Sequence, residues 1–387
     1  MSGDRSNSAI KALSKVPHQL MRNWTIELTS RCNLRCTYCS VPHSTTYGDY
    51  DMPKKRLDKL KMLMKDVKPS IVSLSGRGEL TYIDGWQEIV EPFISSGMNT
   101  HTVTNLAKPL SWEEATTLSR FTSLTFSIDN VDRAITKEVR KGADLRNIIY
   151  NVNLIKAAAV NIGRDDMNFN VIAVVTRSSI GDFKRLASLM VALGTNNLIL
   201  QDLVMDYSKQ VNTVDIGHIS TLNKEELLEA GKDIQAAAMI LNKHKIGFSL
   251  HPSLLTILSA SLGQGTEEVI VEETVQAEKV GEHKRHGCQL QDGQTRDCLH
   301  PWQLGIFLAD GGVEPCCGSY GVTGNYEMAS SVAEVFNSPD TVTLRQEILS
   351  GNLKKPCEFC GTAGAIDIGA FQKKVQKYIT DNIQTPK

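Results

Sequence analysis

Between residues 23 and 204 the hydrophobic pattern alternates between short apolar segments and longer amphipathic ones. The short segments predict β-strands at residues 23–29, 70–75, 100–105, 124–129, 168–175 and 197–204. Apolar residues at helical spacing predict helices at residues 54–67, 86–94, from 111 onward, 145–155 and 182–193. Ser111 and Glu114 have the spacing of a capping box, which marks the start of the third helix. The apolar run Phe169–Val175 predicts a buried parallel strand.

These segments form six β/α repeats in succession, an order that implies a parallel sheet with helices packed outside it. Six repeats are too few for a complete eight-fold barrel. We therefore expect an α/β fold of the partial (β/α)6 TIM barrel type. In such folds the chemistry lies at the carboxyl ends of the strands, so the residues that follow each strand are the first candidates for a site.

A different pattern begins after the sixth strand. An amphipathic, alanine-rich stretch predicts helix, and it is followed by a polar, charged linker and then by a cysteine-rich region. The expected organisation is an N-terminal extension (1–22), the barrel (23–215), a helical segment and linker (216–287), a cysteine-rich domain (288–365) and a C-terminal helix (366–387).

The composition narrows the class of protein. A hydrophobic fraction of 41% and a charged fraction of 22% are ordinary for a globular domain. With 42 basic and 43 acidic residues, the chain lacks the basic excess of a nucleic-acid-binding protein. No apolar run approaches the roughly 20 residues that cross a bilayer, and the polar N-terminus lacks the apolar core of a signal peptide. We expect a cytoplasmic protein that binds neither nucleic acid nor membrane.

The nine cysteines are clustered rather than spread, which favours metal or cluster ligation over disulfides. Cys32, Cys36 and Cys39 form a C-x3-C-x2-C motif directly after the first predicted strand. Three thiolates cannot saturate a four-iron cluster, so one iron keeps an open position for chemistry. A structural zinc site is the alternative, with His43 as a fourth ligand.

This motif, in the loop after the first strand of a partial barrel, resembles the defining signature of the radical S-adenosylmethionine (SAM) superfamily. The resemblance implies a [4Fe–4S] cluster on Cys32, Cys36 and Cys39, with SAM chelating the open iron and a flavodoxin- or ferredoxin-type protein as reductant. It also implies reductive cleavage of SAM to methionine and a 5′-deoxyadenosyl radical.

The resemblance extends to residues expected to contact SAM. Tyr38 corresponds to an aromatic position near the adenine, and the stretch 75–79 resembles a glycine-rich segment that binds the SAM ammonium group. The full set of expected SAM-binding residues is Tyr38, Gly78, Glu79, Thr104, Asn105, Ser127, Asp129 and Arg140. Arg140 is expected to pair with the SAM carboxylate. Glu27, Thr176 and Gln201 match strand-end positions with no defined role.

The C-terminal cysteines resemble the shortened auxiliary-cluster module called a twitch domain, a relative of the longer SPASM domain, built from a β-hairpin and a short helix. The resemblance assigns one auxiliary [4Fe–4S] cluster to Cys298, Cys316, Cys357 and Cys360. A four-cysteine zinc ribbon is the alternative. Cys317 is either a bystander or a hydrogen-atom donor to a substrate radical, and Cys288 has no assigned role.

Together these features predict an enzyme that abstracts hydrogen from a C–H bond of a polar small molecule, such as a sugar, aminocyclitol, nucleoside or amino acid. The outcome would be epimerisation or dehydrogenation. The barrel begins within about 23 residues, which leaves no room for a preceding peptide-recognition domain. A maturase of a peptide or protein substrate is the second hypothesis, and a non-catalytic zinc-binding scaffold is the third.

Overall fold

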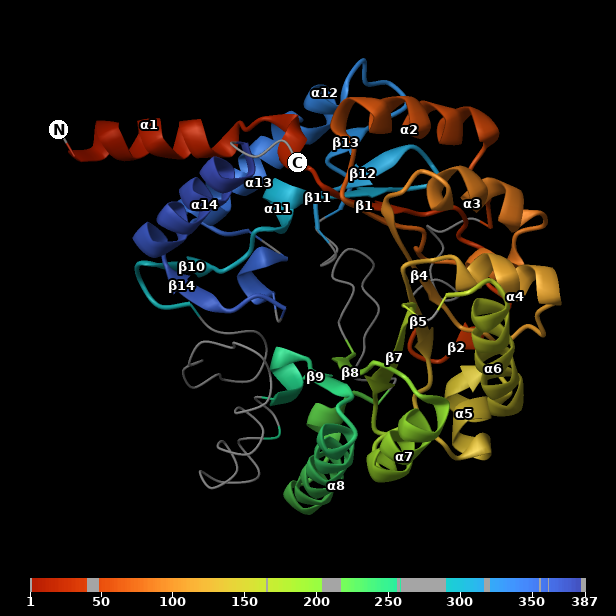
Figure 1. The fold of residues 1–387 in the computed structure, drawn as a ribbon. Helices are drawn as coiled ribbons and strands as arrows, with labels where there is room; N and C mark the ends of the chain where they lie inside the picture. The colour runs from red at the N-terminus through yellow and green to blue at the C-terminus, as the bar shows by residue number, and fades with distance from the viewer. Residues whose placement is uncertain are drawn as a thin grey trace.

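The computed structural model describes residues 2–39, 49–164, 166–203, 217–255, 258, 290–316, 321–354, 356–360 and 362–383. Its centre is a curved sheet of ten strands in the order β13-β12-β11-β1-β3-β4-β5-β7-β8-β9. Figure 1 shows this sheet curving between β13 and β9, with α2, α3, α4, α6, α7 and α8 along its outer side. The partial-barrel architecture expected from the sequence is confirmed.

The six predicted β/α units are all present. Their strands are β1 (Asn23–Ile26), β3 (Ile71–Ser73), β4 (Asn99–Thr104), β5 (Ser123–Ser127), β7 (Asn168–Val175) and β8 (Asn197–Asp202). Their helices are α2 (Lys54–Val67), α3 (Trp86–Ile94), α4 (Trp112–Ser119), α6 (Leu145–Asn161), α7 (Phe183–Leu193) and α8 (Lys224–Lys243). The neighbouring strands pair in parallel, so their carboxyl ends lie along the same edge of the sheet. Shorter elements between them are η3 (Leu80–Tyr82), α5 (Arg133–Val139), β2 (Arg35–Cys36) and β6 (Arg140–Lys141).

Local sequence explains several of these boundaries. The capping box at α4 is formed as predicted, because Ser111 accepts from the Glu114 backbone while Glu114 accepts from the Ser111 backbone. Helix α2 ends at Lys68, which adopts a left-handed conformation just before Pro69. Strand β7 pairs in parallel with both of its neighbours, and its residues alternate between buried and partly exposed along the strand.

Two parts of the sheet were not predicted. After α8 the chain adds a further parallel strand, β9 (Gly247–Leu250), beside β8. On the other side, β11 (Leu304–Phe307) from the cysteine-rich region pairs in parallel with β1 and continues into β12 (Gly312–Glu314) and β13 (Gly324–Asn325). The rings of Trp24 and Phe307 pack 4.3 Å apart across this junction. The C-terminal hairpin is therefore part of the barrel sheet.

The rest of the C-terminal region packs with the start of the chain. It contains β10 (Gln294–Arg296), α11 (His300–Gln303), α12 (Val332–Phe336), α13 (Pro339–Ser350), η5 (Cys357–Phe359), β14 (Ala365–Asp367) and α14 (Ile368–Ile383). The N-terminal extension forms α1 (Ser2–Ser14) and η1 (His18–Leu20), and α1 lies against α13 and α14 (Figure 1). The indole of Trp302 donates to the carbonyl of Leu13 at 2.8 Å, which joins the N-terminal extension to the C-terminal region.

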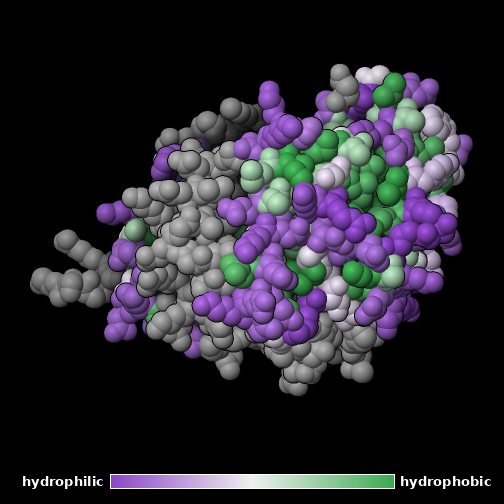
Figure 2. Space-filling model, turned by 90° about the horizontal axis from the view of Figure 1, so that it is seen from below, coloured by the Kyte–Doolittle hydropathy of each residue, from purple (hydrophilic) through white to green (hydrophobic). Residues whose placement is uncertain are grey.

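The surface mixes polar and apolar side chains. On the face seen from below, patches of apolar residues lie between hydrophilic ones (Figure 2). Within the described parts of the chain, no helix combines the length and the apolar character needed to pass through a bilayer.

Candidate active site

The loop after β1 carries Cys32, Cys36 and Cys39 at the carboxyl edge of the sheet. A short antiparallel pairing of β2 with β6 holds this loop and places Cys36 opposite Arg140. The backbone N–H of Thr37 also donates to the Val139 carbonyl at 2.9 Å. The loop that bears the cysteines is thus anchored to the segment that bears the predicted SAM-binding arginine.

The three cysteines belong to one small buried cluster of side chains. Leu34, Cys36, Ala107 and Ala143 form its core, with Cys32, Tyr38 and Cys39 packed against it. Burial raises the pKa of Cys36, and the charge of Arg140 opposes that rise. Burial also raises the pKa of Cys32, opposed by the N–H of Leu34. The iron-free thiols of Cys32 and Cys36 are therefore neutral, and metal binding by these two side chains must release protons.

Asp129, Tyr38 and Arg140 form one buried polar group. The Tyr38 hydroxyl donates to Asp129 at 2.8 Å, and Arg140 Nη1 lies 3.3 Å from the same carboxylate. Arg140 also donates to the Tyr38 oxygen at 2.6 Å. Its Nε is buried with no hydrogen-bond partner among the described residues. A cation with one unused N–H beside the thiols fits an anionic group bound here, such as a thiolate cluster or a ligand carboxylate.

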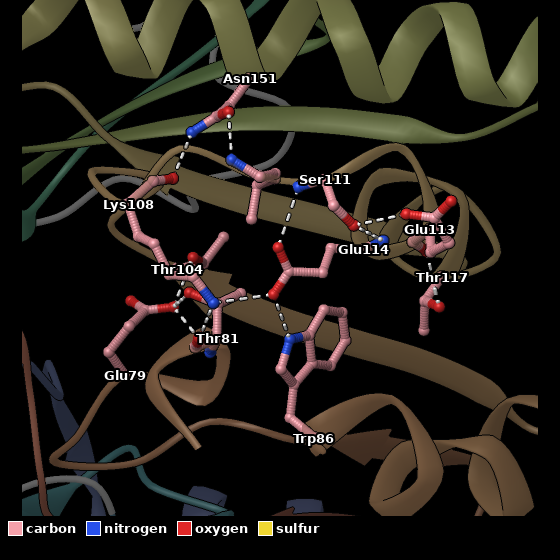
Figure 3. Close-up of polar contacts among 11 residues, drawn as sticks. Glu79, Thr81, Trp86, Thr104, Lys108, Ser111, Glu113, Glu114, Thr117 and Asn151 are labelled. Carbon is pink, nitrogen blue, oxygen red and sulfur yellow. Dashed lines mark hydrogen bonds and ion pairs between the residues drawn. The ribbon is translucent and has the colours of Figure 1, made fainter. Parts of the chain in front are cut away.

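Glu79 lies in the loop that follows β3, directly before η3, and its carboxylate joins this loop to the end of β4. Oε1 accepts from the hydroxyls of Thr81 at 2.8 Å and Thr104 at 2.6 Å, and Oε2 accepts from the Asn105 backbone at 2.7 Å. Figure 3 shows Glu79 reaching Thr81 and Thr104 in this way. The Glu79 residue is 3% exposed, so these donors replace the water that its carboxylate would otherwise bind.

A second buried carboxylate, that of Glu114, stabilises the segment that follows β4. Glu114 accepts from Lys108 at 2.8 Å, from the Trp86 indole at 3.1 Å and from the Ser111 backbone (Figure 3). Asn151 on α6 accepts from the Leu110 backbone and donates to the Lys108 carbonyl. The segment after β4 is therefore held from both sides, which fixes the position of Asn105 at its start.

Asn105 connects this scaffold to the first cysteine. Its Nδ2 donates to Asn33 Oδ1 at 2.8 Å and lies 3.6 Å from the Cys32 sulfur. Its Oδ1 accepts from the Ala107 backbone at 2.8 Å, which determines the orientation of the amide. An N–H group therefore points at the Cys32 sulfur.

The glycines of the stretch 75–79 serve packing within the protein. A Cβ on Gly78 would collide with the Arg31 carbonyl oxygen and would lie 2.6 Å from that of Thr29. A Cβ on Gly76 would meet the Glu27 side chain at 2.6 Å. Both glycines are required because the β3 loop lies directly against the backbone that leads into the cysteine motif.

The second group of cysteines lines one cavity. Cys298 follows β10, Cys316 follows β12, Cys357 begins η5 and Cys360 follows it. All four line one cavity that is partly open to solvent. Burial raises the pKa of Cys357 well above its usual value, and the charges of Cys316, Cys360 and Cys298 raise it further. The four thiols predicted to act together are thus neighbours in the fold.

The sequence was compared with models of known protein families. The model for the Radical SAM superfamily matches residues 26–190, in agreement with the fold and the cysteine loop. Residues 26–190 form a radical SAM domain. No curated protein sequence matches the chain.

Solved structures resemble the chain at low sequence identity. SuiB of Streptococcus suis bound to S-adenosylmethionine has 14% identity and a TM-score of 0.57, over 86% of this chain and 68% of that one. SuiB bound to precursor peptide SuiA has 13% identity and a TM-score of 0.57, over 94% and 73%. Native anSMEcpe with bound AdoMet has 15% identity and a TM-score of 0.55, over 93% and 96%. This likeness shows the fold.

A polar group that the sequence analysis missed lies at the carboxyl ends of β8 and β9. Asp202 ends β8 and is 7% exposed; it pairs with His218 Nε2 at 3.2 Å and accepts from the Ser253 hydroxyl. Because that hydroxyl donates to Asp202, Ser253 Oγ accepts from His251 Nδ1 at 2.7 Å. Parallel pairing puts these residues on the same edge as the cysteine loop of the radical SAM domain. Gln201 was the predicted strand-end residue, one position too early.

Among the described residues, the others predicted from the sequence are buried or make local contacts only. Ser127 is the last residue of β5 and is buried. Thr176 exchanges hydrogen bonds with Ser179 in a tight turn. Glu27 pairs with Arg77 at 3.1 Å. His43, Cys288 and Cys317 lie outside the described residues.

No three His, Cys, Asp or Glu side chains within the described ranges converge closely enough to hold one metal ion. The ligand roles of the seven described cysteines therefore stay predictions.

Proposed function

We propose that this radical SAM enzyme binds a [4Fe–4S] cluster through Cys32, Cys36 and Cys39 and cleaves SAM reductively there. When bound, the cluster and SAM supply a 5′-deoxyadenosyl radical that abstracts hydrogen from a C–H bond of the substrate. The observation that carries this proposal is the position of the three-cysteine loop at the carboxyl edge of the parallel sheet, packed against Arg140 and the ends of β4 and β5. That edge is where such folds place their chemistry.

The surrounding residues would bind and orient SAM. Arg140 has an unused buried N–H at Nε and would receive the SAM carboxylate. Glu79 Oε2 accepts one hydrogen bond from the protein, which leaves a lone pair for the SAM ammonium group. Thr104, Asn105, Ser127 and Asp129 hold the strand ends that frame this space, and Tyr38 packs beside the last cysteine.

The group at β8 and β9 supports a polar small molecule as substrate. Burial lowers the pKa of His251, so its ring is neutral, and the Nδ1–H is used by Ser253. Nε2 then carries a lone pair, which is buried and meets no partner among the described residues. A hydroxyl or ammonium group of the substrate would donate to it. We propose a sugar, aminocyclitol, nucleoside or amino acid in this role.

The outcome we propose is epimerisation or dehydrogenation. Dehydrogenation would deliver an electron to an auxiliary [4Fe–4S] cluster on Cys298, Cys316, Cys357 and Cys360, whose thiols border one cavity. Epimerisation would return a hydrogen atom to the substrate, with Cys317 as the donor. A flavodoxin- or ferredoxin-type protein would reduce the SAM-binding cluster.

A peptide substrate is the second candidate. It is supported by the similarity to SuiB, which has been solved bound to precursor peptide SuiA. Purified enzyme with SAM and reductant separates the two. Candidate amino sugars, aminocyclitols and amino acids should stimulate 5′-deoxyadenosine formation and incorporate a hydrogen label into it. Stimulation by peptides alone would favour the second candidate.

The core proposal is tested by anaerobic reconstitution of the full chain, followed by iron, sulfide and zinc analysis and an assay for 5′-deoxyadenosine with dithionite and SAM. Wild type should release 5′-deoxyadenosine, and Cys36→Ser should not. Cys288→Ser, which changes a cysteine with no assigned role, is the control and should behave like wild type. Zinc in place of iron, with no SAM cleavage, would support the scaffold hypothesis and end the enzyme proposal.

A further inference from the structure

Arg296 is a buried cation at the four-cysteine cavity. It ends β10, is 1% exposed, and lines the cavity together with the four thiols. Its Nε donates to the Cys357 carbonyl at 2.9 Å and its Nη2 to the Glu358 carbonyl at 2.5 Å. Arg296 therefore holds the turn that carries Cys357 and Cys360 in place through two hydrogen bonds.

The third nitrogen, Nη1, is buried and has no hydrogen-bond partner among the described residues. No carboxylate in the described parts of the chain lies within ion-pair distance of Arg296. A guanidinium is always charged in proteins, and burying a charge without a partner costs several kcal/mol. Native proteins seldom retain such a group unless something compensates it.

Another buried arginine in the same region shows the difference. Arg345 is also fully buried, but its nitrogens donate to the carbonyls of Pro301, Ser14 and Phe336 and to the Asn337 side chain. Every nitrogen of Arg345 has a partner, as expected of an arginine that only supports the fold. Arg296 differs because its spare N–H belongs to a side chain that lines a cavity.

The cavity makes a negative occupant the fitting partner. Its walls include four cysteines and the apolar side chains of Pro301, Leu344 and Ile348, so charges inside interact in a low dielectric. Glu347, 7% exposed and paired with Lys354 at 2.9 Å, adds negative charge near Cys357. Metal-bound thiolates would add more, and Arg296 is the cation placed to balance them.

We propose that Arg296 is the counter-ion of the metal–thiolate centre at Cys298, Cys316, Cys357 and Cys360, with Nη1 donating to a sulfur of that centre. This inference rests on the auxiliary cluster of the proposed function. Each electron added to an iron–sulfur cluster adds negative charge, and hydrogen bonds to the sulfurs set its potential. Arg296 therefore raises the reduction potential of this centre and makes it a better electron acceptor. Arg296 is thus a positioning residue: it holds the turn with Cys357 and Cys360 and adjusts the reduction potential of the centre.

The first test is an EPR-monitored redox titration of the reconstituted full chain without SAM. The auxiliary signal is the one that does not change when SAM is then added. Arg296→Gln should shift the midpoint of this signal to a more negative potential. Arg296→Lys keeps the charge but loses the planar guanidinium with its several N–H donors, so it should shift the midpoint less. Lys377→Gln is the control. It removes a cation from an exposed pair with Asp381 on α14, neither residue lines the cavity, and the midpoint should stay unchanged.

The second test compares stability with and without metal. In iron-free protein, Arg296→Gln loses the hydrogen bonds to the Cys357 and Glu358 carbonyls but also removes a buried charge that has no acidic partner among the described residues, so the melting temperature should change little. In the loaded protein it removes the counter-ion, so the melting temperature should fall relative to wild type. Equal destabilisation in both forms, or an unchanged midpoint, would make Arg296 a structural residue and overturn the inference.

The two proposals fail in different ways. If wild type binds zinc at the four thiols, the auxiliary iron–sulfur cluster is wrong, but the comparison of metal-free and zinc-loaded stability still tests Arg296 as counter-ion. If Arg296→Gln does not fold, Arg296→Lys still tests the Nη1 donor: its midpoint should lie below that of wild type, and an unchanged midpoint would overturn the inference.

Discussion

The two groups of cysteines differ in how the protein surrounds them. Cys32, Cys36 and Cys39 belong to one loop, and the charged side chains around that loop are already paired: Arg140 with Asp129, and Glu79 with hydroxyl and backbone donors. The four C-terminal cysteines come from three separate segments around a cavity with apolar walls. The cation there, Arg296, has no acidic partner within the described residues.

The difference indicates different tasks. A preformed polar network holds side chains in place before a ligand arrives, so little ordering cost remains when an organic molecule such as SAM binds. A cavity with sulfur ligands, apolar walls and one counter-ion offers few groups that could recognise a substrate. It suits a centre that accepts electrons or stabilises the fold. The predictions below test this contrast, beginning with the largest expected effect.

Removing the three N-terminal cysteines should abolish metal binding at the first site and leave the C-terminal site loaded. Replacing Cys32, Cys36 and Cys39 by alanine should lower the iron content by about four atoms per chain, the number in one cluster, and reduce 5′-deoxyadenosine formation to background. The C-terminal site should keep its metal because its ligands are unchanged. Iron analysis and EPR check this outcome. Loss of all iron from the triple variant would mean that the two sites do not load independently.

Arg140→Met should destabilise the iron-free protein by about 3–5 kcal/mol, because it leaves Asp129, 1% exposed, buried without its cation. Arg146→Met is the matched control, since Arg146 pairs with Asp144 on the surface at 70% exposure, and it should change the stability little because solvent screens the pair. Urea unfolding measures both. Similar losses for the two variants would show that the network at the first site is not preorganised. Arg296→Gln, by contrast, should not destabilise the iron-free chain.

Asn105→Ser should lower the reduction potential of the SAM-binding cluster. Serine can still accept from the Ala107 backbone but cannot reach the Cys32 sulfur, so one N–H donor to the cluster is lost. The effect should be on the order of 1 kcal/mol, as for a single hydrogen bond. Asn147→Ser is the control, because Asn147 donates to the Ala107 carbonyl and not to sulfur. A redox titration of the SAM-responsive EPR signal would refute this role if both variants matched wild type.

Glu27 links the two regions, and its titration should produce the smallest effect. Its carboxylate pairs with Arg77, which also approaches Glu314 of β12 at 3.9 Å. Burial raises the pKa of Glu27 above its ordinary 4.5, against the opposing charge of Arg77. The folded state then holds the proton more tightly than the unfolded chain. This contribution to stability is present below pH 4.5 and is lost as pH rises through the raised pKa. Each tenfold tightening of proton binding corresponds to about 1.4 kcal/mol.

Unfolding free energies of wild type and Glu27→Gln between about pH 4 and 7 check the sign. The difference between the two chains should change with pH in this direction: the wild type loses stability relative to the variant as pH rises. A difference that does not vary with pH would show that Glu27 titrates normally in the folded protein.

Local sequence was sufficient for much of the fold. Helix α2 matches its predicted range, the Ser111–Glu114 capping box is formed, and the six strands lie where apolar segments predicted them. These features depend on residues a few positions apart, so a short stretch of sequence contains the whole interaction. The three-cysteine motif is equally local, because its ligands lie within eight residues.

Tertiary structure decided the features that depend on residues distant in the chain. The pairing of β11 with β1, the addition of β9 to the sheet and the relay from Asp202 through Ser253 to His251 join segments whose patterns show no sign of one another. Arg296 shows the same limit. Its sequence neighbours say nothing of its burial, because a charged residue is buried only where the surrounding fold supplies partners, and those partners come from other parts of the chain.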